Sequence, residues 1–427
     1  MRRQETIFAL SSGRPPAAVS IIRVSGPHAH AAGEQIAGRL PQSRTAAVRK
    51  LRDPCSGELI DEALIVRFDC PASSTAEDVV EFQCHGGRAV VDALLSALGS
   101  IDGLRQAEPG EFTRRAFENG RIDLTEAEGL ADLIEAETES QRKAALALAE
   151  GGLRKQIGLW QEQLLALSAR AEQAIDYDEE DGALDQSILS GCRALSQDLT
   201  EWLARPRSEL LKDGIRVVVA GPPNTGKSSL INAIVGEERT IVTPVAGTTR
   251  DYIEVPLSLG GIPVRLTDTA GLRDSPDEVE AIGVARARQL VESADILVWL
   301  GDPTDAPDHP RLIKVRSKAD LPEPRHDMQG IVPVSSITGE GLSQLIKRIE
   351  REARAVLPSE DSIALNRRQA AHIARAAEAL EAAAAARDLV LVAEDIRLSR
   401  AAFDRLTGRA GVEDVLDSLF SRFCLGK

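Results

Sequence analysis

The stretch 221–228, which reads GPPNTGKS, holds the residues best suited to chemistry. It fits the pattern G-x-x-x-x-G-K-[ST], in which backbone N–H groups and a helix N-terminus surround a phosphate chain. Lys227 is expected to reach the β- and γ-phosphates of a nucleotide, and the Ser228 hydroxyl is expected to ligate Mg²⁺. An apolar run at 215–220 predicts the strand before such a loop, and residues 229–235 predict the helix after it. The predicted nucleotide contacts of this stretch are Asn224, Thr225, Gly226, Lys227, Ser228 and Ser229.

Two segments further along the chain offer groups for the γ-phosphate and the metal. The loop 246–251 reads AGTTRD, and its Thr249 is assigned to Mg²⁺ and the γ-phosphate. A predicted strand ends in D-x-x-G at 265–271, where Asp268 would hold Mg²⁺ through water and the Gly271 N–H would sense the γ-phosphate. Loss of that phosphate on hydrolysis would free both loops, which is an order–disorder switch. The predicted contacts are Thr243, Pro244, Val245, Ala246, Gly247, Thr248, Thr249, Asp268, Thr269, Ala270 and Gly271.

Base selection is assigned to the segment 316–320, which reads RSKAD. The Asp320 carboxylate can accept hydrogen bonds from the ring N–H and the exocyclic amine of guanine, a donor pair that adenine lacks. Lys318 and Asp320 are therefore predicted to bind the guanine nucleotides GTP and GDP. The usual pattern is N-K-x-D, and Ser317 stands at the asparagine position. Its shorter side chain should weaken the grip on nucleotide more than it changes base choice.

Length and composition exclude several classes of protein. A chain of 427 residues predicts two or three domains. The net charge of −15 argues against non-specific binding of nucleic acid, because no overall positive field attracts a polyanion. Five scattered cysteines without a CxxC pair indicate neither a disulfide framework nor a zinc site, so a cytoplasmic location is expected. No signal peptide is recognised, and no apolar run is long enough to predict a membrane span.

The order of predicted elements indicates a helical domain that is interrupted by an α/β domain. Residues 1–119 read as α+β, with strands at 19–24, 63–68 and 78–85, a helix at 88–98 and a polar loop or hairpin at 44–57. Residues 120–211 read as helical and begin with a predicted capping box of Thr125 and Glu128. Residues 212–350 alternate strands and helices as a parallel sheet requires, and helices return at 351–427. The predicted fold class is α/β plus α.

Blocks outside the nucleotide motifs give the chain a specific resemblance. They read SIIRVSG at 20–26, EDVVE at 77–81, CHGG at 84–87, EPGEFTRRAF at 108–117, NGRIDL at 119–124 and FCLGK at 423–427. Together with the nucleotide-binding motifs, these blocks cover nearly the whole chain in order. The chain resembles the MnmE (TrmE) family of tRNA-modification GTPases. The resemblance implies a P-loop GTPase domain inserted into a helical domain, preceded by an α+β domain that binds folate and forms a homodimer.

The same resemblance implies an activity and partners. A K⁺-activated GTPase would install an aminomethyl-type group at C5 of the wobble uridine (U34) of certain tRNAs. A tetrahydrofolate, as its 5-formyl or methylene derivative, would supply the one-carbon unit. The implied partners are tRNA and an FAD-containing MnmG protein, joined in a heterotetramer with no membrane contact.

Further site residues follow only from the family. Leu272 stands where many small GTPases carry a water-orienting glutamine, and the family implies that Glu280 takes this role. Without the family, the sequence does not decide which of Asp277, Glu278 and Glu280 orients the attacking water. In place of an arginine finger, for which Arg250 and Arg273 are candidates, the family implies a K⁺ ion. The implied K⁺ ligands are Asn224, Thr243, Val245 and Thr248, and the implied folate contacts are Arg23, Glu81, Arg121 and Lys427.

Two regions of the chain are harder to interpret. The family carries a glycine-rich segment before its Ile-Ile-Arg block, whereas residues 14–18 read RPPAA, so close backbone approaches there must differ. The CLGK tail at 424–427 is either a frayed end or, by analogy, a flexible segment that brings the catalytic candidate Cys424 and Lys427 to the folate.

Two other functions also fit the nucleotide motifs. The first is a switch-type GTPase of ribosome or RNA assembly that carries out no modification chemistry. The second is a folate-dependent aminomethyltransferase with an accessory GTPase. An assembly factor would need neither the N-terminal blocks nor the C-x-G-K tail, so these features separate it from the leading interpretation.

Overall fold

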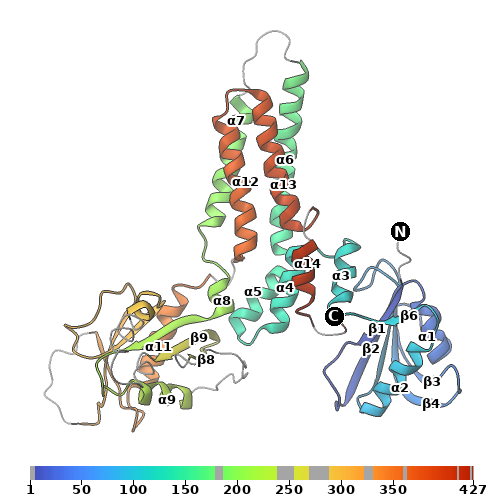
Figure 1. Cartoon of the computed structure of the whole chain (residues 1–427), viewed down its shortest axis with the longest axis horizontal. Helices are drawn as coiled ribbons and strands as arrows, with labels where there is room; N and C mark the ends of the chain where they lie inside the picture. Colours follow the sequence, from blue (N-terminus) through green and yellow to red (C-terminus); the bar gives the residue numbers. More distant parts are fainter. Residues whose placement is uncertain are drawn as a thin grey trace, which may run out of the picture. The chain divides into compact units, whose positions relative to one another are not determined.

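The computed structural model describes residues 5–177, 186–237, 254–268, 288–321, 330–358, 363–410, 413–423 and 426 (Figure 1). The chain forms two compact units. Unit 1 comprises Met1–Ala131, Ala149–Glu162 and Arg400–Lys427, and unit 2 comprises Asp132–Leu148 and Gln163–Ser399. Within the described ranges, none of the helices combines the length and the apolar character that crossing a membrane requires.

Unit 1 begins with a six-stranded sheet in the order β3-β4-β5-β2-β1-β6. Its strands are β1 (Thr6–Leu10), β2 (Val19–Ser25), β3 (Ala46–Arg52), β4 (Leu59–Phe68), β5 (Val79–His85) and β6 (Leu104–Gln106). Only the β1–β6 pair among these is parallel. The helices α1 (Ala29–Ala37) and α2 (Arg88–Gly99) contribute Ile36 and Leu94 to the core, beside Ile22 and Phe82 of the sheet.

Strand alternation turns polar side chains to the opposite face of this sheet. Ile22 and Val24 of β2 lie in the core, so Arg23 between them points the other way. Phe82 of β5 likewise lies in the core, and its neighbour Glu81 shares the face of Arg23. Phe112 of α3 (Glu111–Glu118) is buried with Ile7 and Ala9 of β1 on that second face.

Unit 2 contains a second six-stranded sheet in the order β12-β11-β10-β7-β9-β8, in which β8 alone pairs antiparallel. Its strands are β7 (Ile215–Ala220), β8 (Glu254–Leu259), β9 (Ile262–Asp268), β10 (Ile296–Leu300), β11 (Leu312–Arg316) and β12 (Ile331–Pro333). The helices α9 (Lys227–Glu237) and α11 (Leu342–Arg354) share its apolar core. In such a sheet, ligands bind at the carboxyl ends of the parallel strands.

Helices supply the remaining described elements of the fold. They are α4 (Leu124–Glu135), α5 (Glu139–Ala149), α6 (Gly152–Tyr177), α7 (Gln186–Leu203), α8 (Glu209–Asp213), α12 (Arg367–Ala385), α13 (Leu389–Thr407) and α14 (Glu413–Phe420). In unit 2, the alanine-rich α12 runs along α7, and Ser196 of α7 donates a 3.1 Å hydrogen bond to the Ala377 carbonyl (Figure 1). In unit 1, Trp160 of α6 stacks on Phe403 of α13 with ring centroids 5.9 Å apart.

The predicted fold class is confirmed, because an α/β sheet of parallel strands interrupts the helical elements and an α+β part precedes them. The strands predicted at 19–24, 63–68 and 78–85 and the helix at 88–98 are also confirmed. The stretch predicted at 44–57 as a loop or hairpin is a hairpin, because β3 occupies Ala46–Arg52 and pairs antiparallel with β4 across the turn at 53–58. This edge strand alternates exposed and half-buried residues and carries charges, a pattern that reads as a loop in sequence.

The predicted capping box is wrong by two residues. The helix α4 begins at Leu124, and the Asp123 carboxylate accepts a 2.9 Å hydrogen bond from the Glu126 N–H. In return, Glu126 Oε2 accepts a 2.7 Å bond from the Asp123 N–H. The hydroxyl of Thr125 donates to Asp123 and is fully buried. The reciprocal cap is therefore Asp123–Glu126.

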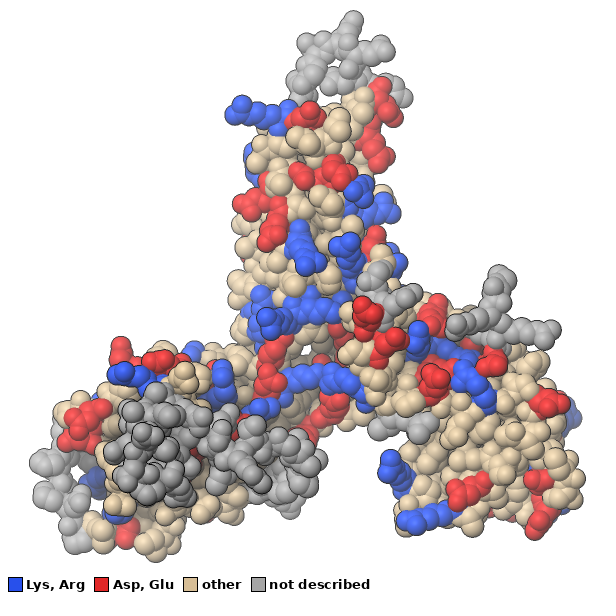
Figure 2. All heavy atoms as spheres, in the orientation of Figure 1, with Lys and Arg blue, Asp and Glu red and all other residues tan. Residues whose placement is uncertain are grey.

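On the face drawn in Figure 2, charge alone does not single out a site. On that face, Lys and Arg side chains are interspersed with Asp and Glu over the described surface of both units. The position of particular side chains must therefore identify the functional regions.

Candidate nucleotide site and N-terminal pocket

The predicted phosphate loop joins β7 to α9. A Cβ at Gly221 would lie 2.0 Å from the Leu300 carbonyl oxygen, and φ there is +152°, so glycine is required at this close approach. The Lys227 side chain is 7% exposed, and its ammonium donates to the carbonyls of Gly221 (3.0 Å) and Pro222 (2.8 Å). These bonds hold the lysine across the mouth of the loop, where phosphate oxygens would compete for the same donors.

Two oxygen-bearing side chains meet beside this loop. Ser228, near the start of α9, donates a 2.5 Å hydrogen bond to Oδ2 of Asp268, the last residue of β9. Asp268 is only 7% exposed. A hydroxyl and a carboxylate at one point are hard oxygen donors of the kind that Mg²⁺ prefers, so the residues fit this ion.

The predicted base loop follows β11 at the same edge of the sheet. Its Ala319 N–H donates to the Val334 carbonyl at 3.2 Å, which ties it to the loop after β12. The Lys318 ammonium donates a 3.2 Å bond to the Asn224 carbonyl in the phosphate loop. Asp320 is exposed, and its carboxylate has no partner among the described residues. It is therefore available to a ligand.

The structure describes some of the predicted site residues, and the others lie outside the described residues. Of the predicted nucleotide, metal and catalytic residues, Asn224, Thr225, Gly226, Lys227, Ser228, Ser229, Asp268, Lys318 and Asp320 all come from the loops and strand ends described above. The others lie outside the described residues: Thr243, Pro244, Val245, Ala246, Gly247, Thr248, Thr249, Thr269, Ala270, Gly271, Glu280, Cys424 and Lys427.

A second candidate site lies on the polar face of the N-terminal sheet. Arg23 and Glu81 face each other across β2 and β5, with Arg23 Nε 2.9 Å and Nη2 2.8 Å from Glu81 Oε1. The Arg23 guanidinium also lies over the Phe112 ring, 5.6 Å from its centroid. Arg23 and Phe112 line a cavity of about 220 Å³ with Thr75 and Ile122. Arg121 is exposed and precedes Ile122, so the cavity lining stops one residue short of it.

A charged network that the sequence analysis missed supports this cavity. Arg115, 6% exposed, donates to Glu77 (3.2 Å) and to Glu111 (3.0 Å). Burial alone would raise the pKa of Glu111, but hydrogen bonds from Arg105, the Glu108 N–H and Arg115 outweigh burial, and its pKa is lowered. The block at 108–117 contains these charges, but its pairing with Glu77 is not visible in sequence.

Backbone contacts hold the two regions that were hard to interpret. The Ala17 N–H donates to the Gly86 carbonyl at 3.0 Å, and a Cβ at Gly86 would lie 2.3 Å from the Ala17 oxygen. In the tail, the Gly426 carbonyl accepts a 2.8 Å bond from the Ser11 hydroxyl, and a Cβ at Gly426 would meet the Leu10 oxygen at 2.0 Å. Gly426 therefore packs against the last residue of β1 and the residue that follows it.

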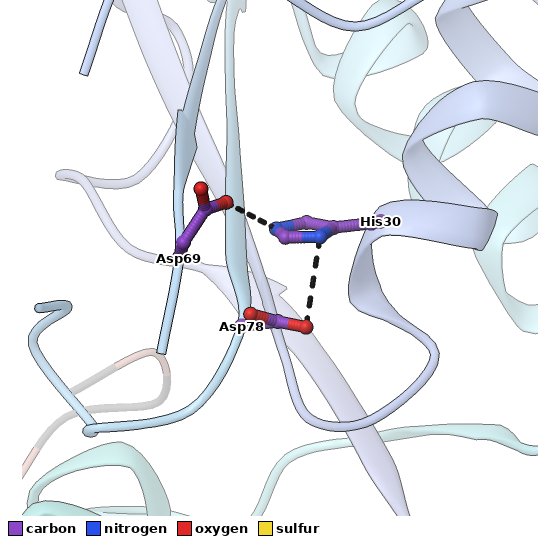
Figure 3. A group of neighbouring side chains, drawn as sticks. All are labelled: His30, Asp69 and Asp78. Carbon is purple, nitrogen blue, oxygen red and sulfur yellow. Dashed lines mark ion pairs between the residues drawn. The ribbon is translucent and has the colours of Figure 1, made fainter. Parts of the chain in front are cut away.

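Figure 3 shows a further cluster in unit 1, formed by His30 of α1 with Asp69 and Asp78. The two carboxylates approach opposite nitrogens of the imidazole, with Nε2 3.5 Å from Asp69 and Nδ1 3.6 Å from Asp78. One ion cannot bind both nitrogens of a ring. Asp69 also accepts from Arg67 at 2.7 Å, and Asp78 accepts from the Cys70 N–H at 2.9 Å. The cluster therefore ties the 69–78 segment to α1.

Comparison with known proteins assigns both parts of the chain to one family. The model of the MnmE helical domain matches residues 124–424, and that of the GTP-binding protein TrmE N-terminus matches residues 6–121. The tRNA modification GTPase MnmE of Erythrobacter litoralis is 49% identical over 99% of this chain and 100% of the relative. The tRNA modification GTPase MnmE of Rhizorhabdus wittichii is 50% identical over 99% of this chain and 97% of the relative. Among solved structures, the G domain of the T. maritima FeoB iron transporter covers 33% of this chain and 98% of that chain, with 26% identity and a TM-score of 0.24. With full-length relatives at this identity, the chain belongs to the MnmE family of tRNA modification GTPases.

Proposed function

We propose that this chain hydrolyses GTP to GDP and phosphate in the course of modifying C5 of the wobble uridine (U34) of certain tRNAs. The observation that carries the proposal is the meeting of Lys227, Ser228 and Asp268 with the base loop at one sheet edge. Lys227 would exchange its two carbonyl partners for β- and γ-phosphate oxygens. Asp320, which is free to accept, would take the paired donors of guanine.

Metal ions would supply the positive charge that this site needs. Ser228 and Asp268 would hold Mg²⁺, together with Thr249, and the ion would neutralise charge on the phosphates. Asn224 is exposed at φ +62°, and no described residue hydrogen-bonds to its side-chain amide. Its amide oxygen is therefore free for K⁺, with Thr243, Val245 and Thr248 as further ligands. Glu280 is assigned to orienting the attacking water.

The cavity beside Arg23 would hold a tetrahydrofolate, as the 5-formyl or methylene derivative. A cationic side chain over an aromatic ring suits a ligand that has both an aromatic system and carboxylates. Glu81 would accept from pterin N–H groups while it holds Arg23 in place. The bound folate would supply the one-carbon unit. Arg121 is proposed to act at the same site, because it precedes Ile122 of the cavity lining. Lys427 and Cys424 are proposed to act there as well, because Gly426 accepts a hydrogen bond from Ser11, the residue after β1.

We further propose a homodimer through the N-terminal part and a heterotetramer with an FAD-containing MnmG-type protein, which acts on tRNA in the cytoplasm. The proposed domain limits are 1–119 for the N-terminal domain, 212–350 for the GTPase domain, and 120–211 with 351–427 for the helical domain.

Nucleoside analysis of tRNA from a strain that lacks this chain tests the function. The expected result is loss of the C5-modified uridine at position 34, restored by the wild-type gene but not by a Lys227→Ala variant. Unchanged wobble uridines, together with a defect in ribosome assembly, would favour an assembly GTPase.

A further inference from the structure

A larger cavity in unit 1 has no part in the function proposed so far. It encloses about 460 Å³, within the range of roughly 300–1,000 Å³ that small-molecule sites occupy. Its lining residues come from the turn between α3 and α4, from α6, and from the end of α13 and the residues after it. Apolar walls come from Ile122 and Ile157, and polar groups come from Asp123, Gln161 and Arg409.

Asp123 lines this cavity with an incompletely paired carboxyl group. The residue is 8% exposed. Its Oδ1 accepts from the Thr125 hydroxyl at 2.7 Å and from the Glu126 N–H at 2.9 Å, whereas Oδ2 has no partner among the described residues. Burial raises the pKa of this carboxyl. Leaving a buried oxygen without a donor is unfavourable, so a ligand that supplies a donor would be stabilised here.

Two donor side chains of the cavity are also uncommitted. The Gln161 amide and the Arg409 guanidinium form no hydrogen bond or ion pair with any described residue. Arg154, by contrast, is held by Glu126 at 2.7 Å. The lining therefore offers one carboxylate oxygen, one amide that can donate or accept, and one guanidinium that donates, and no described residue bonds to them.

Gly158, inside α6, leaves open space at the wall of the cavity. Glycine in a helix costs about 1 kcal/mol relative to alanine, and close packing often explains it. A Cβ at Gly408, also in the lining, would lie 2.7 Å from the Phe117 ring, so packing explains that residue. A Cβ at Gly158 would meet nothing within 4 Å. A larger residue at Gly158 would therefore begin in open space at the wall of the cavity.

We propose that this cavity binds the uracil ring of the tRNA substrate, turned out of its stack. The inference rests on the proposed function and adds the position of the acceptor base. Uracil presents one N–H between two carbonyl oxygens, and enzymes that act on a base read such an edge in a pocket. Asp123 accepts from the N–H, and Gln161 and Arg409 donate to the two carbonyls. Cytosine has an acceptor in place of that N–H and would face the carboxylate unfavourably.

The place of the cavity agrees with this ligand. Ile122 lines both this cavity and the smaller one that contains Arg23. The base and the proposed folate would therefore lie on either side of one side chain. Such a neighbourhood suits transfer between two bound molecules.

The test measures binding of fluorescent anticodon stem-loop RNAs, with U or C at position 34, to the purified full-length chain. Gly158→Leu fills the cavity, and the expected result is at least tenfold weaker binding of the U34 RNA. The matched control is Ala166→Leu, which adds the same side chain at an exposed position of α6 and should bind as wild type does. Equal U34 binding by Gly158→Leu and wild type would overturn the proposal.

A second variant reverses the chemistry of the pocket. In Asp123→Asn, the oxygen keeps its two donors and caps α4, so the amide N–H₂ replaces Oδ2. We expect the preference for U34 over C34 to fall at least tenfold and to shift toward C34, and an unchanged preference would contradict the inference. Equilibrium dialysis of 5-formyltetrahydrofolate tests whether the pterin ring of the folate occupies this cavity in place of uracil. If Gly158→Leu loses the folate but keeps U34 discrimination, the cavity holds a pterin and the inference is wrong. If wild type modifies U34 and the variants match it, only this inference fails and the proposed function stands.

Discussion

The Ser228 hydroxyl and the Asp268 carboxylate lie 2.5 Å apart and hydrogen-bond to each other at the end of β9. A bound Mg²⁺ would be held by the Ser228 hydroxyl and, through water, by Asp268 in place of this bond. We expect Ser228→Ala to lower GTP turnover by about 100-fold, because charge stabilisation at the phosphates is lost. Phosphate release measured over a Mg²⁺ titration checks this, with Ser293→Ala, whose hydroxyl donates to the Leu290 carbonyl, as control. Wild-type turnover in Ser228→Ala would exclude the serine as a metal ligand.

Asp320 is expected to decide the base. Asp320→Asn replaces an acceptor by a donor, so GTP affinity should fall about 100-fold, the loss of roughly 3 kcal/mol from charged hydrogen bonds. Xanthosine triphosphate, which carries a carbonyl in place of the exocyclic amine, should bind this variant better than GTP. Titration with fluorescent nucleotides measures both. A variant that prefers GTP as strongly as wild type does would place the base elsewhere.

The Asn224 proposal predicts a dependence on the monovalent cation. GTP turnover should rise steeply when K⁺ replaces Na⁺ at constant ionic strength, because K⁺ would supply the charge of an arginine finger. Asn224→Ala should lose most of this rise while it still binds GTP. Equal rates of wild type in both salts would remove the K⁺ site.

Glu280 lies outside the described residues, so kinetics must test it. We expect Glu280→Ala to lower turnover about 100-fold with nucleotide affinity retained, as for the loss of a water-orienting group. Single-turnover phosphate release and nucleotide titration separate these effects. Loss of binding would indicate a structural role instead.

Glu111 should make stability depend on pH. Its pKa is lowered in the folded state, so its contribution is complete above the ordinary glutamate pKa and is lost as pH falls through the folded value. Glu111→Gln should therefore lower the free energy of unfolding by about 2–3 kcal/mol at pH 7 and by much less at acidic pH. Urea unfolding measures this. The matched control, Glu118→Gln, removes an exposed pair with Arg114 and should change stability by under about 1 kcal/mol. A difference that grows on acidification would contradict the ion-pair account.

The nucleotide part of the fold was predictable because its signals are local. The strand β7 occupies the predicted residues 215–220, since an unbroken apolar run before a glycine loop has few other interpretations. The cap of α4 was not predictable, because Asp123–Glu126 and Thr125–Glu128 have the same spacing. Which pair forms depends on Thr125, which is fully buried beneath the helix start.

The N-terminal pocket illustrates a different limit. Alternation along β2 and β5 predicts that Arg23 and Glu81 each lie opposite a core residue. The pairing of these two strands brings together residues that are 58 positions apart in the sequence, and a local sequence pattern does not predict such a pairing. The uncommitted groups beside Gly158 likewise come from segments that only the tertiary fold brings together.

The hydrogen bond between Ser11 and Gly426 joins residues 415 positions apart. Because synthesis runs from the N-terminus, Ser11 leaves the ribosome long before its partner exists. The sheet can close early, since all six of its strands lie within Thr6–Gln106. Contacts between distant residues are late to form and slow folding. The contact that places Gly426 at the end of β1 is therefore made only when translation of this sequence is almost finished, so a chain truncated before residue 426 would fold its N-terminal sheet and lack this contact.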